Sequence, residues 1–404
     1  MKETTDSVNR IRIIDAIRGF SLLGILICNM LIFQYGLYGK GMLELFHAST
    51  VDIAAHNVLL VVAEGSFMPI FMFLFGYSLF KLRERLVQSG LKPWRALFRR
   101  FALLAGAGLL HSTLLWDGDI LLPYGITGFV LLLFVNRKPK TLLIWAIILG
   151  VLFAAATYGM YEPSSQGEDP KTVEYVQRSI PILSEGSYGD ITKFREESPL
   201  DIPDAGLIFV AFMLPFMLMP MFLLGIAAAK KGWFRNPRQE RNTYKYGTAV
   251  LLPAGLLLKG FGVAMSQTQI GPVLTQIGGP LLALGYLAAF ALVLSHLSRS
   301  SYLLRAFESV GRLSLTNYLM QTVICTTLFY GYGLGWFGKV GVITGTLLAI
   351  VIYALQAIVS AMLLKRIKNG PFEMLLRIGT YFSLNGKLRN VPQAKPVPPV
   401  SADL

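Results

Sequence analysis

Residues 109–125 read LLHSTLLWDGDILLPYG and connect two apolar runs of the chain. His111, Trp116, Asp117 and Asp119 stand there among side chains that are otherwise mostly aliphatic. Ionisable groups at the edge of a membrane-spanning segment are costly to desolvate, so they mark candidate functional sites. The stretch predicts two membrane helices joined by a polar turn, with a candidate site at that turn. The alternative interpretation is a structural turn at the membrane surface, with His111 as a packing residue.

The composition of the chain is that of a polytopic membrane protein. Of its 404 residues, 54% are hydrophobic and only 15% are charged, and the mean hydropathy is +0.55. A helix needs about 20 apolar residues to cross a bilayer. We therefore predict an all-α membrane bundle of about ten transmembrane helices. The ten apolar segments lie at residues 17–33, 58–80, 97–116, 119–135, 141–158, 206–229, 246–264, 277–296, 313–332 and 342–364.

The distribution of Lys and Arg predicts the orientation of this bundle. Alternate connections along the chain, beginning with residues 1–18, carry 30 Lys and Arg residues, whereas the other set carries six. Basic residues are retained on the cytoplasmic side of a membrane. Both termini are therefore predicted to be cytoplasmic, in a multi-pass protein of the plasma membrane. Because the net charge of +14 is explained by topology, no nucleic-acid partner is expected.

Cysteine and histidine usage gives no sign of a metal centre. Cys28 and Cys325 each lie inside an apolar run, and the four histidines lack the spacing of metal ligands. Neither a disulfide framework nor a bound metal is therefore expected.

The chain divides into four parts. We expect an N-terminal membrane half of five helices over residues 1–158 and an extracytoplasmic loop over residues 159–205. A C-terminal membrane half of five helices plus an interfacial helix follows over residues 206–384, and the Pro-rich tail over residues 385–404 is expected to be disordered. The extracytoplasmic loop is expected to form a partly ordered cap over the outer face, with disorder as the alternative. The first span is expected to remain as a signal anchor.

Two of the predicted helices carry polar side chains along one face. Asp15 and Arg18 are three residues apart, and Asn29 follows Arg18 by about three helical turns. Such a polar stripe is expected to face the bundle interior, although Asp15 and Arg18 also fit an anchoring pair at the inner surface. Asn317 and Gln321 form a similar ridge in the ninth segment, for which interhelical hydrogen bonding is the alternative.

Basic residues gather at the inner ends of the segments. Arg312 stands at the cytoplasmic entrance of the ninth segment, and the connection KLRERLVQSGLKPWRALFRR, residues 81–100, is the densest basic stretch of the chain. Attraction to lipid headgroups explains such a stretch. A docking surface for a polyanion such as coenzyme A is the other interpretation.

Five segments carry a resemblance to a known family. They are DAIRGFSLLGILICN (residues 15–29), FMFLFGYSL (71–79), the stretch 109–125, GRLSLTNYLMQ (311–321) and GPFEMLLR (370–377). Together they resemble the YeiB-like bacterial membrane proteins, domain of unknown function 418. This family is similar to the membrane acyltransferase superfamily that includes heparan-alpha-glucosaminide N-acetyltransferase. The resemblance implies a bundle of about ten helices that moves an acyl group from cytoplasmic acyl-CoA to a hydroxyl or amine acceptor at the outer face.

The resemblance also implies roles for individual residues. Asn29 stands where the sugar O-acylating branch has a catalytic His and where the heparan-type branch has Asn. His47, in an HAS context, resembles a His that serves acetyl transfer in the heparan-type branch. Under this hypothesis His111 or His47 removes a proton from the acceptor, and Asp119 orients the imidazole. The expected substrate-binding residues are Asp15, Arg18, Asn29, Trp116, Tyr124, Arg312, Asn317 and Gln321.

Other functions are compatible with the same sequence. A transporter or exporter of a small molecule or cell-surface precursor would use similar polar stripes and kinked helices, but no predicted span carries a carboxylate at mid-depth, where proton relays usually lie. A sensor or partner subunit without chemistry is a third class. The partners expected are the lipid bilayer and a small-molecule, lipid or glycan acceptor, and the chain is compatible with a homo-oligomer.

Overall fold

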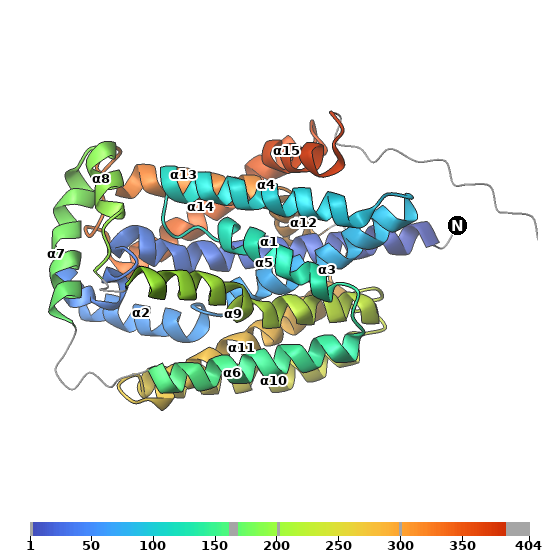
Figure 1. The fold of residues 1–404 in the computed structure, drawn as a ribbon, viewed down its shortest axis with the longest axis horizontal. Helices are drawn as coiled ribbons and strands as arrows, with labels where there is room; N and C mark the ends of the chain where they lie inside the picture. Colours follow the sequence, from blue (N-terminus) through green and yellow to red (C-terminus); the bar gives the residue numbers. More distant parts are fainter. Residues whose placement is uncertain (1–2, 161–168, 200–202, 299–300, 385–404) are drawn as a thin grey trace, which may run out of the picture.

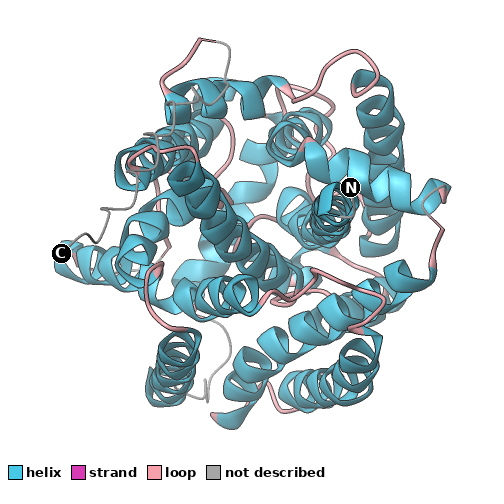
Figure 2. Cartoon of the chain, turned by 90° about the vertical axis from the view of Figure 1, so that its right-hand side faces the viewer, coloured by secondary structure: helices cyan, strands magenta, loops and turns pink. Residues whose placement is uncertain are grey.

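The computed structural model describes residues 3–160, 169–199, 203–298 and 301–384. Within these ranges all regular secondary structure is helical, and Figure 2 shows many of the helices close to end-on. Seven segments are long and apolar enough to cross a membrane, which confirms the expectation of a polytopic helical bundle. These candidate spans are Arg12–Tyr35, Thr50–Gln88, Pro139–Gly159, Phe209–Lys231, Arg241–Ala264, Ile270–His296 and Val342–Leu363.

The helices follow one another with short connections. Their bounds are α1 Glu3–Tyr35, η1 Gly39–Gly41, η2 Leu43–Phe46, α2 Thr50–Val62, α3 Phe67–Gln88, α4 Pro93–Leu114, α5 Leu121–Phe134, α6 Pro139–Met160, α7 Pro170–Glu185, α8 Tyr188–Arg195, α9 Asp204–Lys231, α10 Arg241–Ala264, α11 Ile270–His296, α12 Tyr302–Arg312, α13 Ser314–Phe329, α14 Val342–Leu363 and α15 Pro371–Tyr381.

Each of the ten expected segments overlaps a helix, but three of these helices are not among the seven candidate spans. They are α4, which begins with several basic residues, and α5 and α13, which have 14 and 16 residues. The number of ten crossings and the orientation of the termini therefore remain predictions.

The second expected segment, residues 58–80, is not one helix. α2 ends at Val62 and α3 begins at Phe67, with Gly65 in the left-handed region between them at φ 66°. The Nζ of Lys259 on α10 donates to the carbonyl oxygen of Glu64, and it lies 3.2 Å from the Ser66 hydroxyl oxygen. The break is stable because a side chain distant in sequence satisfies the polar groups of the turn.

α1 packs closely against α12 through two glycines. A Cβ atom at Gly19 would overlap the carbonyl oxygen of Phe307, and one at Gly311 would overlap the carbonyl oxygen of Asp15. Small residues allow membrane helices to approach with their backbones almost in contact. This contact places the polar face of α1 beside α12 and the start of α13.

α7 and α8 lie across one end of the bundle, opposite the end that holds the first residues of α1 (Figure 1). We call these the cap end and the basic end. The Tyr188 hydroxyl donates to the carbonyl oxygen of Leu114 over 2.7 Å, and Arg195 contacts Asp117 and the carbonyl oxygen of Ser112. α8 thus covers the turn after α4. Residues 161–168, 200–202 and the predicted disordered tail lie outside the described residues.

Candidate functional site

His111 and Asp119 meet in the buried turn between α4 and α5. The Nδ1 atom of His111 lies 2.8 Å from Oδ1 of Asp119, and each side chain is only 2% exposed. The second carboxylate oxygen of Asp119 accepts a hydrogen bond from the backbone N–H of Leu122 over 2.7 Å. Asp119 therefore caps the N-terminus of α5 and holds the imidazole at the same time. A carboxylate on Nδ1 favours the tautomer that carries its proton there.

The other ring nitrogen of His111 faces Thr322 on α13. Nε2 lies 3.0 Å from the Thr322 hydroxyl oxygen, in a buried contact. With the ring proton on Nδ1, Nε2 is an acceptor and the hydroxyl donates to it. Asp119, His111 and Thr322 thus form one hydrogen-bonded chain. Thr322 could not be recognised from the sequence, because a hydroxyl in an apolar helix usually bonds its own backbone.

Tyr318 lies one helical turn before Thr322 and next to the imidazole. Its ring centroid is 5.5 Å from that of His111, and its hydroxyl oxygen accepts a hydrogen bond from the backbone N–H of Ile120 over 3.2 Å. Among the described residues no acceptor is present for the proton of this hydroxyl. Tyr318 thus contacts the His111 ring and also lines a cavity, which His111 does not.

A cavity of about 700 Å³ runs from Tyr318 to the basic end of the bundle. Ile120, Leu121 and Tyr124 line it near Tyr318, and exposed Arg85, Gln88 and Arg312 line it at the surface. Aromatic and aliphatic side chains form much of the rest of its lining, with Phe71, Phe75, Phe101 and Leu104 among them. Cavities of this size commonly hold small-molecule ligands and cofactors.

The cavity carries an excess of positive charge. Seven basic side chains line it, against the three carboxylates of Asp15, Glu84 and Glu373. The basic residues are Arg18, Lys81, Arg85, Arg100, Arg235, Arg312 and Arg377. Such a basic lining favours an anionic ligand.

Arg18 is held in place by three partners. It pairs with Asp15 over 2.8 Å, donates to the Ser78 hydroxyl over 2.9 Å and lies 3.4 Å from the carbonyl oxygen of Gly311. In contrast, Arg100 has no side-chain partner within the described part of the chain. Arg100 was recognised in the sequence only as part of the basic connection.

The structure brings some of the sequence-predicted residues to this cavity and leaves others outside it. Asp15, Arg18, Tyr124 and Arg312 line the cavity, and His111 and Asp119 lie behind Tyr318. The predicted residues that do not line it are Asn29, His47, Trp116, Asn317 and Gln321.

Three of the residues outside the cavity, Trp116, His47 and Asn29, differ in their burial. Trp116 is buried and stacks on Phe33 of α1, with ring centroids 4.2 Å apart. It is therefore part of the hydrophobic core next to the turn between α4 and α5. His47 is exposed and ends η2 with φ 53° in the left-handed region. Asn29 is buried, at 7% exposure.

Asn317 and Gln321 are occupied by contacts with α14. The Asn317 amide donates to the Ser360 hydroxyl over 2.9 Å, and the Gln321 amide donates to the side-chain oxygen of Gln356 over 2.9 Å. Gln356 in turn donates to the backbone carbonyl of Asn317 over 3.0 Å. Interhelical hydrogen bonding, the alternative given for this ridge, therefore describes these two amides.

In the residues that the structure describes, no group of three His, Cys, Asp or Glu side chains is placed to hold a metal ion.

Comparison with known proteins identifies relatives along nearly the whole chain. A family described as "Protein of unknown function (DUF418)" matches residues 228–383. The uncharacterized protein YeiB of Escherichia coli strain K12 is 26% identical over 385 residues, which cover 90% of this chain and 94% of YeiB. The uncharacterized protein YxaH of Bacillus subtilis strain 168 is 35% identical over 387 residues, covering 93% of this chain and 95% of YxaH. The chain belongs to the YeiB-like DUF418 family.

Membership of the DUF418 family confirms the resemblance to the YeiB-like membrane proteins seen in the sequence. With its candidate spans, the chain is an integral membrane protein of this family. The family match begins near the end of α9 and includes α13 with Thr322, whereas His111 and Asp119 lie before it. The similarity to YxaH extends over nearly the whole of both chains.

Proposed function

We propose that this DUF418 protein transfers an acyl group from a phosphate-bearing acyl thioester, such as acyl-CoA, to a hydroxyl or amine acceptor. The observation that carries the proposal is the Asp119–His111–Thr322 chain, which lies behind the inner end of a basic cavity. A general base, a carboxylate that orients it and an anion-binding entrance are the parts that such a reaction needs.

The imidazole of His111 acts as the general base. The acceptor loses a proton as it attacks the thioester carbonyl, and Nε2 of His111 is the nitrogen that takes it up. The Thr322 hydroxyl relays this proton, because a hydroxyl can donate to Nε2 and accept from the acceptor group. Collapse of the tetrahedral intermediate breaks the C–S bond, and the imidazolium returns its proton to the thiolate of coenzyme A that leaves. Asp119 stabilises the imidazolium and keeps the other ring proton on Nδ1 throughout.

Tyr318 is placed to stabilise the oxygen of the thioester carbonyl. Tyr318 lines the cavity, and its hydroxyl has a proton without an acceptor among the described residues. A donor at this position would support the negative charge that develops on the carbonyl oxygen during attack. Asn317 and Gln321, which were expected from the sequence to bind substrate, have amides occupied by contacts with α14, so we assign this role to Tyr318.

The remainder of the cavity suits the other parts of the donor. Guanidinium groups bind phosphate through paired hydrogen bonds, and Arg100 is available for such contacts. The aromatic and aliphatic lining would take the less polar arm of the donor that leads to the acyl group. The donor would enter from the basic end, which the Lys and Arg distribution predicts to be cytoplasmic.

The test is release of free coenzyme A from acetyl-CoA by the purified protein, with a membrane extract as the source of acceptors. His111→Gln is expected to lower the rate by about 10²–10⁴-fold, the usual contribution of a general base. His47→Gln, on an exposed residue outside the cavity, is expected to keep the rate. A lower rate in His47→Gln together with an unchanged rate in His111→Gln would identify His47 as the general base instead.

A carrier is the second candidate, and one observation favours it. The cavity reaches the surface at the basic end, while α7 and α8 cover the other end. Access from one side at a time is what a transporter requires. Uptake of a labelled solute into proteoliposomes, without consumption of acetyl-CoA, would favour the carrier.

A further inference from the structure

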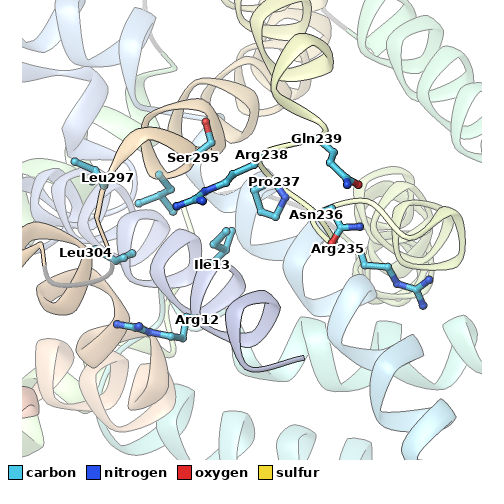
Figure 3. A pocket seen from close by; sticks show the side chains of 11 residues that line it. Arg12, Ile13, Arg235, Asn236, Pro237, Arg238, Gln239, Ser295, Leu297 and Leu304 are labelled. Atoms are coloured by element: carbon cyan, nitrogen blue, oxygen red, sulfur yellow. The ribbon is translucent and has the colours of Figure 1, made fainter. Parts of the chain in front are cut away.

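A second pocket of about 390 Å³ lies at the basic end, outside the proposed catalytic site. It is formed by the start of α1, the connection between α9 and α10, and the segment from the end of α11 to α12 (Figure 3). Three arginines line it, and none of its lining residues is acidic. The residues used below are Arg12, Arg235, Arg238, Gln239, Ser295 and Leu304.

The connection that supplies two of these arginines is held in a defined conformation. The carboxylate of Glu240 accepts from the backbone N–H of Phe234 over 2.8 Å and from that of Asn236 over 3.0 Å. Phe234, at φ 63°, stacks on Tyr244 with ring centroids 5.8 Å apart. The Tyr77 hydroxyl donates to the carbonyl oxygen of Trp233 over 2.9 Å. The arginines therefore project from a preorganised loop, which lowers the cost of binding a ligand.

Arg238 is the arginine best placed to bind an anionic ligand in this pocket. Arg12 pairs with Glu308 over 2.8 Å, and Arg235 also lines the larger cavity. In Figure 3, Arg235 points away from the other side chains, whereas Arg238 reaches across the pocket toward Leu297. Neither Arg235 nor Arg238 has an ion pair or side-chain hydrogen bond within the described ranges.

The pocket lies at the depth where membrane spans end. Arg12 begins the first candidate span, Lys231 and His296 end two others, and Arg241 begins a fourth. The pocket residues lie within a few positions of these four ends, except for Leu304 on α12. Lipid headgroups occupy this level of a bilayer, and their phosphates attract Lys and Arg. One wall is apolar, from Ile13, Leu294, Leu297 and Leu304, as the upper part of an acyl chain would require.

We propose that this pocket, which Gln239 and Ser295 also line, binds a phosphate group through Arg238, and that the phosphate is carried by an anionic phospholipid of the adjoining leaflet. A planar guanidinium gives a phosphate two parallel hydrogen bonds. The same chemistry would accept a free phosphate, so the test separates the two sources. The proposal does not depend on acyl transfer.

The experiment places the full-length protein in nanodiscs of phosphatidylcholine, with and without a fraction of phosphatidylglycerol. The apparent melting temperature is measured for the wild type, for Arg238→Gln, and for Arg95→Gln. Arg95 is an exposed arginine at the start of α4 that lines neither cavity, so it controls for the loss of one positive charge. A third arm adds inorganic phosphate to the phosphatidylcholine discs.

Phosphatidylglycerol is expected to raise the melting temperature of the wild type and of Arg95→Gln, and to raise that of Arg238→Gln by less than half as much. If only inorganic phosphate raises the melting temperature, and Arg238→Gln loses this rise, the pocket is a phosphate site. Its ligand is then a soluble phosphate, and the phospholipid is overturned. A rise that Arg238→Gln retains in full, or no rise in any arm, would overturn the proposal. Native mass spectrometry of the wild type, which is expected to retain bound phosphatidylglycerol, provides a readout that does not need the variant to fold.

Discussion

The imidazole of His111 and the carboxylate of Asp119 are joined by a contact of 2.8 Å across the turn between α4 and α5. Both residues belong to the quoted stretch 109–125, so this part of the site is assembled locally. Its remaining members come from α13, more than 190 positions further along the chain. The local pair gives the site its base, and the packing of α13 gives the base its partners.

Asp119→Asn is predicted to lower acyl transfer by about 10²–10⁴-fold, because an amide cannot stabilise the imidazolium that forms during proton transfer. The Asn side-chain oxygen can still accept from the N–H of Leu122, so α5 is expected to keep its cap. The measurement is coenzyme A release by the purified variant. Its melting temperature serves as the control, and wild-type activity in a folded variant would remove Asp119 from the mechanism.

Thr322→Val and Thr322→Ser are predicted to differ strongly in acyl-transfer activity. Valine has nearly the same shape but leaves the buried Nε2 of His111 without a partner, which costs about 1–3 kcal/mol of stability and also interrupts the proton relay. Serine keeps the hydroxyl and is expected to retain most of the activity. Equal rates for the two variants would mean that the Thr322 hydroxyl takes no part in the reaction.

Gly311→Ala is predicted to separate α12 from α1. The new methyl group would overlap the carbonyl oxygen of Asp15, and overpacking of this kind typically costs about 1–3 kcal/mol. Gly106→Ala is the matched control, because a Cβ atom at Gly106 meets nothing within 4 Å. The check is thermal unfolding in detergent. A loss of stability in the control as large as that in Gly311→Ala would argue against the close approach of the two helices.

Lys259→Met is predicted to destabilise the break between α2 and α3. The substitution keeps the length of the side chain but leaves the carbonyl oxygen of Glu64 with only the long contact of 3.5 Å from the Ser66 hydroxyl, and a buried acceptor that loses its main donor costs about 1–3 kcal/mol. Lys245→Met, on an exposed position of the same helix, is expected to change the stability little. Hydrogen exchange of residues 60–70 would show whether the effect is local to the turn.

The helices and the local pair could be predicted from the sequence because they depend on neighbouring residues. Apolar segments locate the helices, and the isolated polar groups of the quoted stretch point to His111 and Asp119. Thr322 and Tyr318 could not be found in this way, since a hydroxyl within an apolar helix gives no sign of the ring that it will meet. The break near Gly65 depends on Lys259, about 190 residues away, so segment length alone suggested one continuous helix.

Binding of the coenzyme A donor is the most direct test of the proposed acyl transfer. The melting temperature of the detergent-purified protein is measured with acetyl-CoA, free coenzyme A and ATP at equal concentrations, for the wild type, Arg100→Gln and the control Arg95→Gln. A ligand at 100 times its Kd stabilises the folded state by about 2.7 kcal/mol. We predict that both coenzyme A species stabilise the wild type and Arg95→Gln more than ATP does, and that Arg100→Gln loses most of the stabilisation by coenzyme A. No shift, or an equal shift with ATP in the wild type, would contradict binding of the donor.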